Sequence, residues 1–83
     1  MRELNENVFA FVDCPVEGYE LACENRKEAI AQAHKLLETW HRAYPDVVKA
    51  SVTLFVPRED GSNLEMEYEI GLGGKTESLG SFE

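Results

Sequence analysis

The chain has 83 residues, with 16 acidic against 8 basic side chains, so its formal net charge at pH 7 is −8. A surface of this sign repels phosphate, which disfavours both direct nucleic-acid binding and contact with an anionic membrane surface. A hydrophobic fraction of 43% is typical of a globular domain, and the length suits one sheet and one helix with little room for a deep pocket.

We expect neither a signal peptide nor a membrane span. No apolar run follows Arg2, and no stretch approaches the ~18 apolar residues that a membrane-spanning helix requires. The two cysteines, Cys14 and Cys23, are too few for a disulfide scaffold. The expected protein is therefore cytoplasmic, with reduced thiols.

Residues 7–23 predict a β-hairpin. The continuous apolar run at residues 8–12 is typical of a central strand, and residues 19–23 alternate again after a turn that contains Pro and Gly. The register is ambiguous by one residue, and one of the two registers turns Phe9 and Phe11 outward. We prefer the register that turns the larger side chains inward together: Phe9, Phe11, Tyr19 and Leu21.

An amphipathic helix is predicted from residue 26. Asn25 is suited to cap its N-terminus, and Glu28 at the third helical position completes a variant of the capping box. Apolar side chains recur at helical spacing along one stripe, formed by Ile30, Ala33, Leu37, Trp40 and Tyr44. Pro45 ends the helix.

Residues 47–56 and 64–70 predict a second hairpin, because both segments alternate apolar and polar side chains. A turn that contains Gly61 joins them. We choose the register that keeps the apolar side chains of both strands on one face. It pairs three sets of residues: Val56 with Leu64, Leu54 with Met66 and Val52 with Tyr68.

These elements predict an α+β fold of two layers in the order ββαββ, with one helix on one face of a four-stranded antiparallel sheet. The strand order 2-1-3-4 places the two most apolar strands in the centre and the acidic fourth strand at an edge, where charge discourages aggregation. We assign residues 1–72 to a single domain. Residues 73–83, rich in Gly and Ser, are expected to form a flexible C-terminal tail.

The helix leaves one face of the sheet open, and apolar groups on that face predict an interaction surface. In the preferred register these groups include Val8, Val12 and Phe55. An acidic row on the last strand adjoins them, formed by Glu65, Glu67 and Glu69. Such a row is either a solvated strand face or the rim of a site for a basic partner. The expected partner is another protein or a second copy of the chain.

A metal site is a weaker prediction. His34, Glu38 and His41 lie at helical positions i, i+4 and i+7, so they share one edge of the helix and offer ligands that suit a transition metal. They also flank the apolar stripe, where half-buried histidines without a metal are common. Cys14 could be a reactive thiol, but no basic neighbour in the sequence marks it. We expect no catalytic residue, no metal and no cofactor.

Residues 25–33 resemble the helix start of small ββαβ domains such as the HicB-type antitoxins. The likeness rests on Glu28, Ala29, Ile30 and Ala33. The proline-containing segment that those domains have before the helix is absent here. The predicted order of two strands followed by a helix is part of the likeness.

The predicted function is that of a small, acidic, non-enzymatic interaction or regulatory module that uses its open sheet face. One alternative is an antitoxin-like inhibitor that presents carboxylates where the phosphates of a nucleic acid would sit; charge and size motivate it. The other alternative is a metal- or thiol-dependent activity that uses the helical residues His34, Glu38 and His41, or Cys14.

Overall fold

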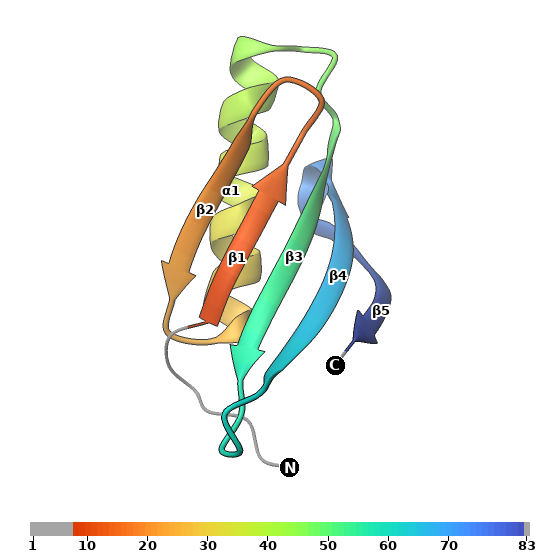
Figure 1. Cartoon of the computed structure of the whole chain (residues 1–83). Coiled ribbons are helices and arrows are strands. Elements are labelled where there is room, and N and C mark those ends of the chain that lie inside the picture. Colours follow the sequence, from red (N-terminus) through yellow and green to blue (C-terminus); the bar gives the residue numbers. More distant parts are fainter. Residues whose placement is uncertain (1–7, 83) are drawn as a thin grey trace.

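The structure is a computed structural model that describes residues 8–82, with side chains described for residues 8–80 (Figure 1). Five strands, one α-helix and one short 3₁₀ segment follow each other along the chain: β1 (Val8–Asp13), β2 (Gly18–Cys23), α1 (Arg26–Ala43), β3 (Lys49–Pro57), β4 (Asn63–Gly71), η1 (Leu72–Gly74) and β5 (Lys75–Phe82). The fold is α+β, with one helix against an open antiparallel sheet, as the sequence predicts.

Within residues 8–82 the sheet has five strands in the order β2-β1-β3-β4-β5, so the prediction of four strands followed by a tail is wrong. The chain turns after β4 through Gly73 and Gly74, which have φ values of 77° and 80°. β5 then pairs with β4, and its backbone hydrogen bonds do not depend on apolar side chains. The last segment therefore forms an edge strand, although its composition, rich in Gly and Ser, does not predict one.

The preferred register of the first hairpin is wrong for β1 but correct for β2, where Tyr19 and Leu21 lie on the helix side of the sheet. Val8, Ala10 and Val12 are buried against the helix, whereas Phe9 and Phe11 lie on the opposite face. The reason is the size of the helical residues above them. Ala29 and Ala33 are fully buried, so the helix lies close to the sheet, and side chains the size of Val and Ala fill the remaining space.

The helix and the second hairpin follow the sequence-based expectations. The Asn25 side chain accepts a hydrogen bond of 2.8 Å from the backbone N–H of Glu28 at the start of α1. Ala33, Leu37 and Trp40 are buried, but Tyr44 lies beyond the end of the helix and is exposed. All three predicted pairs between β3 and β4 are present.

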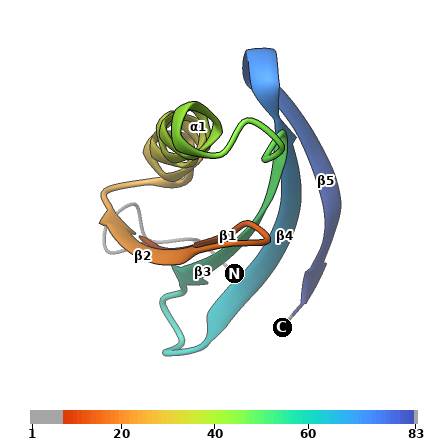
Figure 2. The same cartoon turned by 90° about the horizontal axis from the view of Figure 1, so that it is seen from above.

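The helix lies on one side of the sheet, and the sheet curves around that side from β2 to β5 (Figure 2). The buried core lies between the two layers and is formed by apolar side chains of β1, β3 and α1, Trp40 among them, with Cys23, Val47 and Ile70. β5 continues the sheet beyond β4 (Figure 2). A hydrogen bond of 2.8 Å between His34 Nε2 and Thr76 Oγ1 connects it to the helix.

Candidate interaction face

The sheet face turned away from α1, here called the outer face, can be mapped residue by residue. Directly paired residues of neighbouring strands project to the same face, and alternate residues of one strand share a face. Because Phe9 projects outward, its partners Ala22 on β2 and Phe55 on β3 also belong to the outer face. The same pairing extends to Glu65 on β4.

Three phenylalanines form what we call the aromatic cluster: Phe9, Phe11 and Phe55. Phe9 is 51% exposed and Phe11 38% exposed, and both are among the largest apolar groups open to solvent in residues 8–80. The rings of Phe11 and Phe55 meet edge to face, with centroids 5.5 Å apart and planes at 89°. This geometry is a favourable one for two aromatic rings, so the cluster is packed within itself as well as exposed.

An acidic column runs along β4 beside the aromatic cluster. Glu65 pairs with Phe55, Glu67 with Thr53 and Glu69 with Ser51, so all three carboxylates belong to the outer face, as the sequence predicts. All three residues are half-buried. Glu69 forms an ion pair of 3.6 Å with Lys49. Within residues 8–80, Glu65 and Glu67 form no ion pair.

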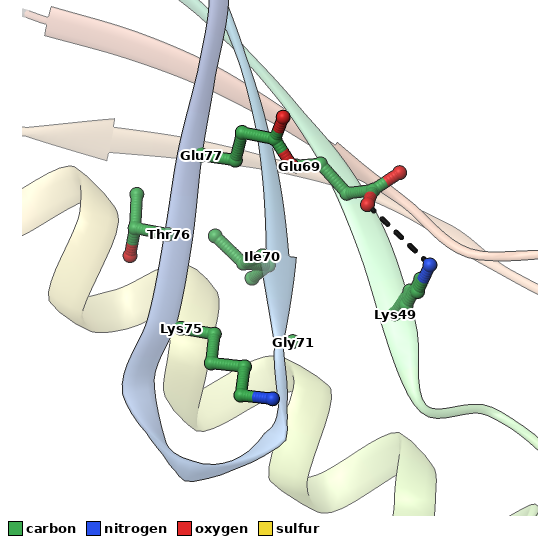
Figure 3. Close-up of a pocket in the computed structure, with 7 residues that line it drawn as sticks. All are labelled: Lys49, Glu69, Ile70, Gly71, Lys75, Thr76 and Glu77. Carbon is green, nitrogen blue, oxygen red and sulfur yellow. Dashed lines mark ion pairs between the residues drawn. The ribbon is translucent and has the colours of Figure 1, made fainter.

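Two lysines lie at the end of the outer face beyond Glu69. Lys49 and Lys75 are both paired with Gly71, one from each neighbouring strand. A Cβ atom at Gly71 would lie 3.6 Å from the Cβ of Lys75, so the lysine stem covers the glycine. Figure 3 shows both lysines lining an open pocket of about 400 Å³ with Glu69 and Glu77.

A second open hollow of about 360 Å³ adjoins this pocket and shares Lys49 and Glu69 with it. Asp13 and Cys14 line its other side. Each hollow contains acidic and basic groups together, so neither has the single-sign lining that concentrates an ion of opposite charge.

The described part of the outer face has a clear excess of negative charge. Six carboxylates belong to it by pairing and alternation: Asp13, Glu20, Glu65, Glu67, Glu69 and Glu77. Lys49 and Lys75 are the two ammonium groups, which leaves this face with a net charge of −4. The excess is concentrated beside the aromatic cluster, away from the lysines.

The structure changes the set of apolar residues on the predicted interaction surface. Val8 and Val12, expected on the open face, are 1% and 0% exposed beneath the helix and cannot touch a partner there. Phe9 and Phe11 take their place because the register differs by one residue. The small residues of the helix were the signal for this choice, since Ala29 and Ala33 leave no depth for aromatic rings.

The proposed metal ligands have other neighbours. His34 bonds Thr76, and the Nδ1 atom of His41 lies 3.0 Å from the carbonyl oxygen of Val47, near the C-terminal end of the helix. Glu38 is exposed. Among residues 8–82, no three His, Cys, Asp or Glu side chains lie close enough together to hold a metal ion.

Both cysteines are free thiols. Cys23 is buried, and this burial, together with the negative charge of Glu28, raises the pKa of its thiol. A raised pKa keeps Cys23 protonated and unreactive near neutral pH. Cys14 is half-buried in the β1–β2 turn, where its backbone N–H donates to the Glu17 carbonyl at 2.8 Å.

Comparison of the chain with protein-family models, with curated proteins and with solved structures finds no match. Within residues 8–82, no helix combines the length and apolar character needed to cross a lipid bilayer.

Proposed function

We propose that the protein is a non-enzymatic binding module that holds a basic protein partner on its outer face. The observation that carries this proposal is the aromatic cluster, with Phe9 and Phe11 exposed and Phe55 half-buried. It lies beside two carboxylates, Glu65 and Glu67, that have no ion-pair partner within residues 8–80. Exposed apolar clusters rimmed by polar groups are typical of protein interaction sites. Aromatic side chains also supply much of the binding energy at such sites.

Charge favours a basic partner over a second copy of the chain. A second copy stacked on the same face would oppose two surfaces that each have a net charge of −4 in their described part. Like charges across an interface cost free energy, whereas a basic surface would gain from the same carboxylates and associate faster. Self-association is therefore one outcome of the test below and is not the function proposed.

The first experiment locates the contact. Phe11 is replaced by a photoreactive phenylalanine analogue, and Lys35, exposed on the helix, is replaced likewise in a control chain. Irradiation in an extract of the source cells should attach a partner to the Phe11 variant only. Capture alone does not support the proposal, so the partner is then purified and its binding measured directly.

The second step tests the charge. The double substitution Glu65→Lys and Glu67→Lys should weaken partner binding about tenfold or more, since it turns two attractive rim charges into repulsive ones. The matched control changes Glu24 and Glu38 to Lys, because both are exposed elsewhere and the net charge changes equally. Equal effects of the two double variants would contradict a role for the outer face. If the purified protein is a homodimer, the partner of the outer face is a second copy of the chain and not a basic protein.

A narrower form of the same function is mimicry of a nucleic acid. Three carboxylates at every second position of an extended strand are spaced about 6.8 Å apart, which produces a regular line of negative charge. A basic partner that normally binds DNA would then be displaced from it. Failure of the protein to compete with DNA for its purified partner at low salt would exclude this form and leave the general proposal intact.

A further inference from the structure

We propose that the aromatic cluster is the docking surface for an arginine side chain of the partner, with Glu65 and Glu67 as its counter-charges. This inference rests on the proposed function, and it specifies the chemical group that the outer face recognises. It depends on aromatic rings and carboxylates in adjacent positions of the same sheet, where the carboxylates of Glu65 and Glu67 have no ion pair within residues 8–80.

The aromatic part provides a surface on which a planar cation can stack. Because Phe11 and Phe55 meet edge to face at 89°, the edge of one ring lies against one face of the other, and the ring that presents its edge keeps both faces clear of this contact. Phe9, paired with Phe55, is 51% exposed. A guanidinium group is planar and weakly hydrated, so it stacks on aromatic faces more readily than an ammonium group does.

The carboxylate part lies within reach of the same rings. Glu65 is directly opposite Phe55, and side chains in that relation have Cβ atoms about 4.5–5.5 Å apart. Glu67 follows two residues later on the same face. Both glutamates are half-buried, so solvent screens their charges less than it screens a fully exposed carboxylate.

The other end of the outer face is less suited to a cation. Glu69 is already paired with Lys49, and Lys75 lies across Gly71 from that pair. A cation arriving there would meet two ammonium groups. Charge complementarity therefore selects the end that contains the aromatic cluster, and it predicts that the partner's arginine lies over Phe55 and Glu65.

Two defined peptides test the inference on the full-length chain. One is a capped pentapeptide with two arginines on each side of a central leucine, and the other has lysine in place of each arginine. We expect the arginine peptide to bind about twofold to fivefold more tightly. In amide NMR titrations its largest shifts should fall at Phe9, Phe55, Glu65 and Glu67.

Three variants separate the contribution of the aromatic ring to peptide binding from that of the carboxylates. Phe55→Leu retains an apolar side chain but removes the ring, so it should abolish the preference for arginine over lysine. Glu67→Gln should lower the affinity of the protein for both peptides. Glu69→Gln removes a carboxylate that is already paired with Lys49, so it should change either affinity less than twofold. If Phe55→Leu fails to fold, Phe9→Leu provides the same test at a more exposed ring.

Equal affinities for the two peptides, or an arginine preference that survives loss of the ring, would overturn the inference. The proposed function has a separate readout, since binding of the purified partner to the Phe11→Ala variant needs no assumption about arginine. If that substitution weakens partner binding while the peptides do not differ, only the arginine inference fails. If neither the partner nor the peptides contact the outer face, both fail.

Discussion

Asp60 shows how a single residue shapes the loop between β3 and β4. Its Oδ1 atom accepts hydrogen bonds from the backbone N–H of Ser62 at 3.0 Å and from the Ser62 hydroxyl at 2.6 Å. These hydrogen bonds favour the ionised carboxylate and hold the pKa of Asp60 below its usual value. Gly61, between the two residues, has a φ of 88°, which residues with a side chain rarely adopt.

The substitution Ser62→Ala should therefore raise the pKa of Asp60 toward the ordinary carboxyl value, measured by NMR titration of its side-chain carbonyl carbon. Because folding lowers this pKa, the contribution of Asp60 to stability is complete above the ordinary carboxyl pKa. It is lost as the pH falls through the lowered pKa of the folded state. Ser51→Ala on the outer face is the control, and an unchanged Asp60 pKa in Ser62→Ala would contradict the hydrogen-bond explanation.

At the scale of elements, the spacing between helix and sheet decides which side chains become available to a partner. Ala29 and Ala33 bring α1 close to β1, so β1 buries Val8, Ala10 and Val12 and leaves its aromatic residues outside. The choice follows from side-chain volume on the helix, although its effect appears on the opposite face of the sheet. Packing in the core thus determines the composition of the interaction face.

Enlarging one of these alanines should cost stability. Ala33→Leu forces extra volume between α1 and the sheet, and we expect a loss of about 1–3 kcal/mol in the free energy of unfolding. Ala31→Leu is the matched control, because Ala31 is exposed on the same helix. Urea denaturation measures both variants. Equal stabilities would show that the helix is not tightly packed against β1.

The turn into β5 requires glycine at Gly73 and Gly74, where φ is positive, but not at Gly71. Gly74 has a φ of 80°, whereas Gly71 has an extended φ of −132° with room for a methyl group. Gly74→Ala should therefore lower the free energy of unfolding by about 1–2 kcal/mol. Gly71→Ala should leave it nearly unchanged. Thermal melting compares the two, and an equal loss in both would mean that backbone conformation is not the cause.

The elements with a strong side-chain pattern were predictable from the sequence, and those without one were not. The N-cap at Asn25 and the β3–β4 register follow from local chemistry and from alternation, and both are present. The β1 register depended on the volume of side chains on α1, which begins 13 residues after β1 ends, and β5 depends on backbone pairing. For the outer face, the sequence identified Phe55 and the acidic column but excluded Phe9 and Phe11 through the register error.

At the scale of the whole molecule, the net charge of −8 is confined to a small fold. The radius of gyration is 12.8 Å, which is shorter than the Debye length of about 30 Å at 0.01 M salt. Because acidic groups outnumber basic groups by 16 to 8, repulsion between the acidic groups acts across most of the fold when the ionic strength is low. This repulsion destabilises the compact state and also keeps copies apart.

The melting temperature should rise as NaCl is increased from about 0.01 M to about 0.15 M, because screening weakens this repulsion. Glu65→Gln with Glu67→Gln should reduce the rise more than Glu24→Gln with Glu38→Gln, since the first pair lies among other carboxylates on the outer face. Both double variants have the same net charge. A melting temperature that falls with added NaCl would contradict the explanation.

β5 contains a bulge, because its register shifts by one residue between the partners of Glu67 and Tyr68. This bulge affects how readily the edge of the sheet pairs with another chain. A strand that borders solvent offers unpaired backbone groups to any passing chain, and irregular geometry makes it a poor template for growth. β5 is irregular at this bulge and at Gly80, whose φ is 140°, while the β4 edge that it covers is a regular run of nine residues. Detachment of β5 would expose that regular edge, so β5 shields this side of the sheet from pairing with another chain.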